Sequence, residues 1–308
     1  MNPGTNVAMT ALCCALLAVA CAEKRDLPTS AEKESIPTRT ISAIDVTTLT
    51  DPPCVFSSVG TTMTLTADCT TYMTIPILDG FTLDGAGHTI TAMDPPTYPA
   101  DHFRGAVVKN ANPGATVHVV NLTVSASGLH DVCDGSGPPD DRLRGILLDE
   151  ASGSITTSAA VHINQGASGC QEGNGIEVRN FGSTGTKMVL VDHNMVLDYQ
   201  KGGIVANGDV VATVTANTVQ GVGPVPYIAQ NGIQLGFGAT GEVSGNSISD
   251  NFYTGCSHKA AAKTDCIPYV AAGLLLYDID ASMIRRSNNR FSNNQFNVLL
   301  VTYQSLDS

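Results

Sequence analysis

Short runs of alternating apolar and polar residues recur along the chain, and each run predicts a β-strand. One set of runs begins with Gly: Gly105-Ala-Val-Val, Gly145-Ile-Leu-Leu, Gly175-Ile-Glu-Val, Gly203-Ile-Val-Ala, Gly232-Ile-Gln-Leu and Gly273-Leu-Leu-Leu. From Gly145 to Gly232 these glycines are 30, 28 and 29 residues apart. A second set begins with Asn and lies between the first: Asn121-Leu-Thr-Val, Asn194-Met-Val, Asn217-Thr-Val, Asn246-Ser-Ile and Asn289-Arg-Phe. A repeat of this length predicts a solenoid, because stacked coils bury the apolar side of every short strand.

Two other all-β folds compete with the solenoid. A β-sandwich does not produce a regular Gly-Ile spacing, and propeller blades are about 40 to 50 residues long. The Asn positions also favour stacked coils, because Asn tolerates left-handed backbone at turns. Equivalent Asn residues in a stack can bond to one another.

The repeats resemble those of the pectate-lyase-like superfamily of right-handed parallel β-helix proteins. The segment from Ile75 to Ala92, IPILDGFTLDGAGHTITA, is similar to the entry coil of that superfamily, and the Asn-Gly-Ile and Asn-x-Val/Ile repeats are similar to its rungs. The resemblance extends over residues 60–300 and implies an all-β, right-handed parallel β-helix. The superfamily contains lyases, hydrolases, epimerases, tailspikes and proteins without known activity, so the resemblance implies a fold more than an activity.

One corner of each coil carries the long loops. The distance from a Gly motif to the next Asn motif stays between 14 and 19 residues, whereas the distance from Asn to the next Gly varies from 9 to 27. Insertions on one face of a repeat protein often mark its binding face. The long loops 125–143 and 250–271 flank the short connection 198–202, which predicts a groove across the coils.

Side chains that suit a saccharide gather around this groove. Strand alternation directs one group outward: Asp149, Glu177, Arg179, Asn207, Gln234 and Tyr277. A second group lies in the loop corner: Arg142, Arg144, Tyr199, Tyr227 and Tyr253. Sugar rings bind to aromatic faces and short polar groups, and Tyr offers both. These residues are the expected substrate contacts.

A polysaccharide lyase is the first functional hypothesis. β-Elimination next to a uronate needs a base for the α-proton and a positive charge beside the carboxylate. Lys201 or Tyr199 is the expected base, because both lie in the low middle of the groove. Arg142, Arg144 and Arg179 are the candidate cations, and Ca²⁺ is the candidate cofactor. Its expected ligands are Asp140, Asp141 and Glu172, with Asp149 and Glu177 as further oxygen donors.

Structural interpretations of the same residues remain open. Lys201 is also consistent with a solvated turn residue, and Glu177 with Arg179 is consistent with a ladder of charges that keeps a sheet face soluble. A glycoside hydrolase would need two carboxyl groups, for which Glu177 with Asp149 or Glu172 are the candidates. The third hypothesis is a non-catalytic, carbohydrate-binding or adhesive surface protein.

Composition and charge restrict the partners. Only 14% of the 308 residues are charged and the net charge is −12, which excludes a coiled coil and a general nucleic-acid binder. The expected partner is a polysaccharide or glycan. A polyanionic polymer would need Ca²⁺ or the local basic cluster to approach so acidic a protein. The oligomeric state is left open.

The N-terminal sequence predicts export. Residues 1–22 are apolar and uncharged and read as a signal peptide, with Cys21 in a lipobox-like context as a candidate lipidation site. An uncleaved hydrophobic anchor is the alternative, and a lipid on Cys21 is the expected membrane contact. Residues 23–45 read as a polar tether and residues 46–308 as the β-helix domain.

Six cysteines follow the signal peptide, and an even number in an exported chain favours disulfides over a metal site. The expected pairs are Cys54 with Cys69, Cys133 with Cys170, and Cys256 with Cys266.

Overall fold

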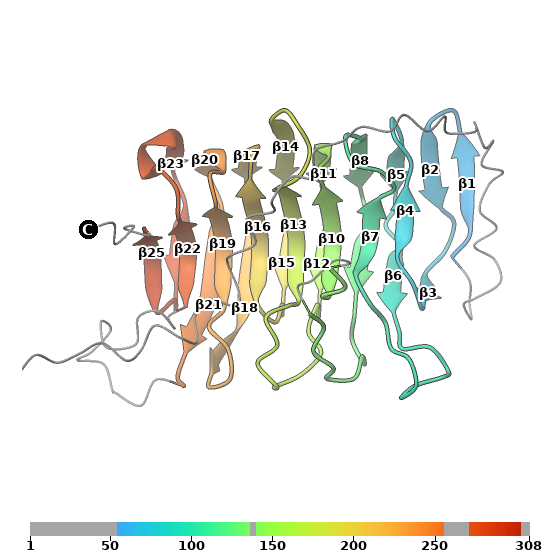
Figure 1. Ribbon diagram of the computed structural model, residues 1–308, viewed down its shortest axis with the longest axis horizontal. Coiled ribbons are helices and arrows are strands. Elements are labelled where there is room, and N and C mark those ends of the chain that lie inside the picture. Colours follow the sequence, from blue (N-terminus) through green and yellow to red (C-terminus); the bar gives the residue numbers. More distant parts are fainter. Residues whose placement is uncertain (1–53, 136–139, 256–270, 303–308) are drawn as a thin grey trace, which may run out of the picture. The chain divides into compact units, whose positions relative to one another are not determined.

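The computed structural model describes residues 54–135, 140–255 and 271–302. In these residues the chain forms 25 β-strands and one short 3-10 turn, η2 (Ala281–Met283). The strands belong to three sheets of nine, eight and eight strands (Figure 1). After β1, each coil contributes one strand to sheet I, then one to sheet II, then one to sheet III.

Sheet I contains β1 (Phe56–Val59), β2 (Thr62–Leu65), β5 (Thr82–Asp84), β8 (Thr116–Val120), β11 (Ser152–Thr156), β14 (Lys187–Asp192), β17 (Val210–Thr215), β20 (Thr240–Ser244) and β23 (Ile284–Ser287). Sheet II contains β3 (Cys69–Thr71), β6 (Thr89–Ala92), β9 (Thr123–Ser125), β12 (Ala159–Val161), β15 (Met195–Leu197), β18 (Thr218–Val225), β21 (Ser247–Tyr253) and β24 (Arg290–Ser292). Sheet III contains β4 (Ile75–Ile77), β7 (Ala106–Asn110), β10 (Arg144–Asp149), β13 (Asn174–Asn180), β16 (Gly202–Gly208), β19 (Asn231–Gly236), β22 (Ala272–Tyr277) and β25 (Phe296–Val301).

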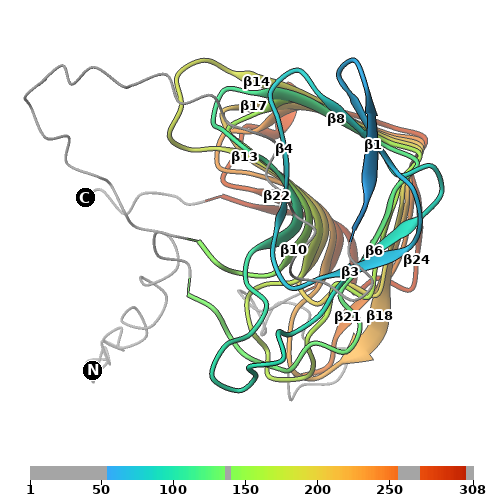
Figure 2. The same ribbon diagram turned by 90° about the vertical axis from the view of Figure 1, so that its right-hand side faces the viewer.

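Neighbouring strands within each sheet are parallel, apart from β1, which pairs antiparallel with β2. Seen from the N-terminal coils, the chain passes clockwise through the three sheets as it recedes (Figure 2). This is a right-handed turn, the hand that crossover connections between parallel strands almost always adopt. The expected right-handed parallel β-helix is confirmed.

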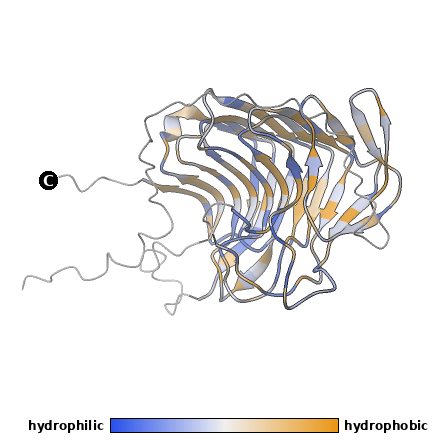
Figure 3. Cartoon of the chain, turned by 45° about the vertical axis from the view of Figure 1, so that its right-hand side comes forward, coloured by the Kyte–Doolittle hydropathy of each residue, from blue (hydrophilic) through white to orange (hydrophobic). Residues whose placement is uncertain are grey.

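The core is a set of aligned apolar columns inside the coils. In sheet III one column contains Ile146, Ile176, Ile204, Ile233 and Leu274, which are paired in register and fully buried. Burial of each such side chain stabilises the fold by about 1.5–3 kcal/mol. Polar residues alternate with the apolar ones along the strands (Figure 3).

The Gly motifs lie at the start of strands of sheet III, and from Gly145 to Gly273 the coil leaves no space for a side chain at these positions. A Cβ on Gly175 would stand 2.4 Å from Val196 Cγ1 and 2.9 Å from the Gly203 carbonyl oxygen. Glycine is therefore required for the close approach of sheets II and III at this corner.

Asparagines stack at the entry to sheet II, as the sequence predicts for four of the five Asn motifs. The side-chain amides of Asn194, Asn217 and Asn246 each donate to the side-chain oxygen of the next Asn, ending at Asn289, over 2.9–3.0 Å. The first motif is out of register by one residue. Asn121 occupies the left-handed position before the ladder (φ 53°), together with His193 and Ala216.

The long described loops lie between sheets II and III, which confirms the expected corner. They include residues 93–105 and 162–173, whereas the connection from β15 to β16 is only 198–201. Two of the expected disulfides are present: Cys54–Cys69 in the first coil and Cys133–Cys170 between successive corner loops. The signal peptide, Cys21, the tether and the pair Cys256–Cys266 lie outside the described residues.

In the described part of the chain, no helix has the length and apolar character needed to cross a membrane.

Candidate functional site

The outer face of sheet III carries a network of charged side chains over β7, β10 and β13. Arg144 begins β10, and its Nε donates to Glu177 Oε2 on the neighbouring strand β13 at 2.8 Å. The same oxygen accepts a bond from Asn174 Nδ2 at 2.7 Å. Both Arg144 and Glu177 are almost completely buried. Because β10 and β13 are neighbouring strands, side chains that point outward from them meet although Arg144 and Glu177 are 33 positions apart in the sequence.

Asp140, from the loop before β10, joins three arginines. Its carboxylate accepts two bonds from Arg142, both at 2.8 Å, and two from Arg144, at 3.0 and 3.1 Å. Arg179 Nη1 adds a bond of 2.5 Å to Asp140 Oδ2. The Asp140 side chain thus fastens the corner loop to two strands of the sheet.

The second half of the network lies near the ends of the same strands. Arg179 donates two bonds to Asp149, at 2.8 and 3.0 Å, because the register places Asp149 directly opposite it. Lys109 on β7 completes the row with its Nζ 2.9 Å from Asp149 Oδ2.

The carboxylates of this network stay ionised. Burial alone would raise the pKa of Glu177, but the positive charges of Arg144 and Arg179 hold that pKa below its ordinary value. Burial likewise opposes ionisation of Asp140 and Asp149, yet their arginine partners lower both pKa values. The carboxylates in turn raise the pKa of Arg179. The network therefore holds fixed positive and negative charges at neutral pH.

Lys201 lies directly before β16, at the loop-corner end of the sheet. Its Nζ donates to the Ala229 carbonyl oxygen at 3.0 Å. Burial lowers the pKa of Lys201 to about 8. The next residue, Gly202, is in register with Asn174 on β13, and Asn174 is in register with Arg144 on β10. Lys201 therefore lies two strands, or about 10 Å, along the stack from Arg144. The partly buried ammonium argues against a freely solvated turn residue.

Tyr199 is not on this face, and the expectation of an accessible tyrosine base is wrong. The side chain is fully buried inside the coil and its hydroxyl donates to Asn251 Oδ1. Burial raises the pKa of Tyr199, so the phenol stays protonated.

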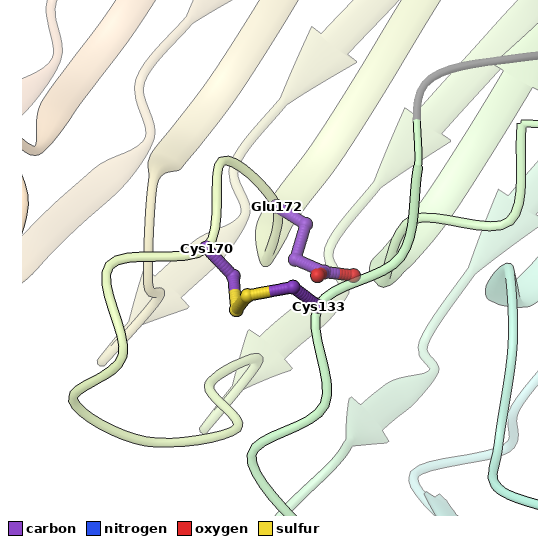
Figure 4. A group of neighbouring side chains, drawn as sticks. All are labelled: Cys133, Cys170 and Glu172. Carbon is purple, nitrogen blue, oxygen red and sulfur yellow. A yellow bond between two sulfur atoms is a disulfide. The ribbon is translucent and has the colours of Figure 1, made fainter.

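Two of the expected calcium ligands, Asp140 and Glu172, do not fit a Ca²⁺ ion. The Asp140 carboxylate is surrounded by three guanidinium groups, whose charge repels a cation. Glu172 is 1% exposed, and its two oxygens accept the backbone N–H groups of Asp134 and Leu143. Figure 4 shows Glu172 beside the Cys133–Cys170 disulfide, whose bonded sulfurs have no thiolate to offer a metal. Glu172 holds the corner loops together through these hydrogen bonds, and burial raises the pKa of its carboxyl group.

The carboxyl pairs considered for a glycoside hydrolase are also occupied. Glu177 and Asp149 are both held as ionised partners of arginine, and Glu172 is committed to backbone N–H groups. A hydrolase needs one carboxyl group that donates a proton to the leaving oxygen. Neither pair provides one that is free to do so.

The other predicted contacts divide between two places. Asn207, Gln234 and Tyr277 lie on the outer face of sheet III, over β16, β19 and β22. Tyr227 and Tyr253 lie at the loop corner instead. Tyr227 is near a hollow of about 400 Å³ that is lined in part by His162 and Asp198, whose side chains are hydrogen bonded.

Two aromatic residues beside sheet III were not expected from the sequence. Phe237 follows β19 and packs edge-on against Tyr277, with ring centroids 5.2 Å apart, and Phe181 follows β13 and packs against Phe237 at 5.9 Å. Phe181 is 64% exposed. A signal was present in the sequence, since each Phe directly follows a Gly-motif strand.

The fold is that of a right-handed parallel β-helix protein. No protein-family model matches the sequence, and no curated protein matches it. Among solved structures, the chain is similar to the A-module of the mannuronan C-5 epimerase AlgE4 from Azotobacter vinelandii. That match has 14% identity and a TM-score of 0.24, and covers 78% of this chain and 86% of the other.

Proposed function

We propose that this protein binds an acidic polysaccharide across the outer face of sheet III and cleaves it by β-elimination. The observation that carries the proposal is the position of Lys201, a lysine of lowered pKa, directly before β16 and about 10 Å along the stack from the row that contains Arg144. A base with a pKa near the working pH and a neighbouring source of positive charge are the two groups that the reaction needs.

In the proposed reaction, arginine side chains supply the positive charge beside the uronate carboxylate. Neutral Lys201 Nζ takes the proton from the carbon next to the uronate carboxylate. The electron pair left on that carbon forms the new carbon–carbon double bond, and the glycosidic carbon–oxygen bond breaks. The departing oxygen takes up a proton from water. Arg142 and Arg179, the partly exposed arginines of the network, are the proposed contacts of the uronate carboxylate.

Product analysis on a panel of polyuronates tests this function. We expect unsaturated oligosaccharides, detected by their ultraviolet absorbance, from the wild-type protein. Loss of a positioned base costs about 10²–10⁴ in rate, so Lys201→Ala should lose at least 100-fold. Lys187→Ala is the matched control, because the Lys187 ammonium lies on β14 of sheet I and bonds to Thr184. Full activity of Lys201→Ala would show that Lys201 is not the base.

A non-catalytic carbohydrate-binding protein is the second candidate. Arg144 and Arg179 already form ion pairs with Glu177, Asp140 and Asp149. Because the charges of these arginines are balanced within the protein, the pairs favour a binding surface over a catalytic site. Binding of a polyuronate without unsaturated products, and without new reducing ends, would support this candidate over the lyase.

A further inference from the structure

The outer face of sheet III has a charged half and an uncharged half. The charged network lies over β7, β10 and β13. By contrast, the strands β16 (GGIVANG), β19 (NGIQLG) and β22 (AGLLLY) contain no Asp, Glu, Lys or Arg. A ligand that lies across the coils on this face therefore contacts charged side chains over β7, β10 and β13 and uncharged side chains over β16, β19 and β22.

Aromatic rings line the edge of the uncharged half. Phe181, Phe237 and Tyr277 form a continuous row of edge-to-face contacts from the end of β13 to the end of β22, about 14 Å along the stack. The intervening coil has Gly208 in left-handed backbone (φ 79°), and a Cβ there would stand 2.2 Å from the Asn180 carbonyl oxygen and 3.1 Å from the Phe181 ring. Gly208 thus leaves room for the Phe181 ring to reach across this coil.

A pair of amides lies next to this row. Gln234 Nε2 donates to Asn207 Oδ1 at 3.1 Å, across neighbouring strands. The Asn207 amide lies over Gly236, which has no side chain to displace it. A Cβ at Gly236 would be only 2.7 Å from Asn207 Oδ1. Within the described residues, the Asn207 Nδ2 donor and the Gln234 Oε1 acceptor have no partner. The pair therefore offers one donor and one acceptor at a fixed separation.

We propose that the uncharged half binds a neutral pyranose unit, and that the polymer recognised is a heteropolysaccharide with neutral sugars next to uronates. The apolar C–H face of a pyranose packs on aromatic rings, and its hydroxyl groups match an unused donor and acceptor. A polymer made only of uronates would place carboxylates over strands that provide no cation. This inference rests on the proposed binding of an acidic polysaccharide to the charged half.

The test compares a polymer that alternates uronate and neutral sugar with one that is all uronate. Hyaluronan and other alternating polymers serve as the first class, and polygalacturonate and alginate as the second, with affinity measured by calorimetry. We expect at least one alternating polymer to bind about tenfold more tightly than either homopolymer. Phe181→Ala and Asn207→Ala should each weaken that binding about tenfold and leave homopolymer binding unchanged.

Two controls separate recognition from folding. Phe181→Tyr keeps an aromatic ring and should bind as the wild type does. Met188→Ala removes another exposed apolar side chain, on sheet I, and should change neither affinity. Equal affinity for both polymer classes, an equal effect of Phe181→Ala on both, or no binding of either class would overturn the inference.

The outcome is distinguishable from that of the proposed lyase activity. Cleavage that depends on Lys201 but is indifferent to Phe181 and Asn207 would retain the lyase and refute the neutral-sugar subsite. Selective binding that depends on Phe181, without unsaturated products, would retain the subsite and refute the lyase.

Discussion

Asn194 donates its side-chain amide to the side-chain oxygen of Asn217 at 3.0 Å, from one coil to the next. The same Asn217 oxygen accepts the backbone N–H of Asn194 at 2.8 Å, and the Asn217 amide donates to the Val191 carbonyl oxygen and to Asn246. Every polar atom of this buried side chain is therefore paired. Such a ladder fixes the register of the coils as well as stabilising them.

Replacement of Asn217 by alanine should strongly destabilise the β-helix. The change removes the hydrogen bonds of one side chain and leaves the buried backbone N–H of Asn194 without its partner, which costs about 3 kcal/mol or more. Urea unfolding followed by circular dichroism measures the loss. Gln220→Ala is the control, because Gln220 is exposed and its bond to Asp250 lies on the surface, so a change within about 0.5 kcal/mol is expected. Equal effects of the two variants would contradict a structural role of the ladder.

Replacement of Arg144 by alanine should also be costly, because it leaves the buried Glu177 carboxylate without its main partner. Breaking a buried ion pair from one side costs about 3–5 kcal/mol. The exposed pair Arg285–Glu242 provides the control, and Arg285→Ala should cost about 1 kcal/mol or less. A double variant, Arg144→Met with Glu177→Met, should recover much of the loss. Failure of the double variant to recover would indicate that the network is required for packing beyond charge compensation.

Acid should weaken the same network. The pKa values of Glu177, Asp140 and Asp149 are lowered from ordinary values of 4.5 and 3.8. A lowered folded-state pKa contributes stability that is present above the ordinary pKa and is lost as the pH falls through the folded-state value. We therefore expect the free energy of unfolding to fall below about pH 4.5, and Arg144→Ala to flatten this fall. An unchanged acid profile in Arg144→Ala would argue against the network as its origin.

The fold and the corner of the long loops could be predicted from the sequence, because the Gly and Asn motifs repeat with nearly constant spacing. Strand alternation also identified the outward positions of Glu177, Arg179 and Asp149. The partners of these side chains could not be predicted. They come from adjacent coils, and the exact register between coils decides which carboxylate meets which arginine.

Two expectations about individual side chains were wrong, each for its own physical reason. Tyr199 was expected beside Lys201 in the low middle of the groove, but its side chain packs inside the coil and its hydroxyl donates to Asn251 Oδ1. Glu172 was expected near Asp140 as an oxygen ligand, but its carboxylate is used by backbone N–H groups of the corner loops. Local sequence indicates which side chains are polar, whereas the fold decides which unpaired backbone groups they must satisfy.

The disulfides should be detectable directly. Peptide mapping without reduction should yield linked peptides for Cys54–Cys69 and Cys133–Cys170, and the pair Cys256–Cys266 remains a prediction from the sequence. The Cys133–Cys170 bridge joins residues 37 positions apart, and removing such a bridge costs about 2–4 kcal/mol. A Cys133→Ser/Cys170→Ser variant should therefore unfold at lower urea concentration and be cut sooner by protease in the corner loops. Free thiols at Cys133 and Cys170 in protein purified without reductant would contradict the pairing.

Lys201 predicts an activity and a stability that both rise with pH. The folded-state pKa of about 8 lies below the ordinary value of 10.5, so the folded protein releases the proton of Lys201 earlier than the unfolded chain does. Between about pH 8 and pH 10.5 the unfolded state binds more protons, and the free energy of unfolding should increase with pH. In the same protein, the rate of elimination should rise about tenfold per pH unit below pH 8 and level off above it, because neutral lysine is the base. Comparing urea unfolding of the wild type and Lys201→Met at about pH 7 and about pH 9, a unit on either side of the folded-state pKa of about 8, isolates the contribution of this one group. A parallel pH dependence in the two proteins would show that Lys201 titrates normally, and would remove the basis for its role as the base.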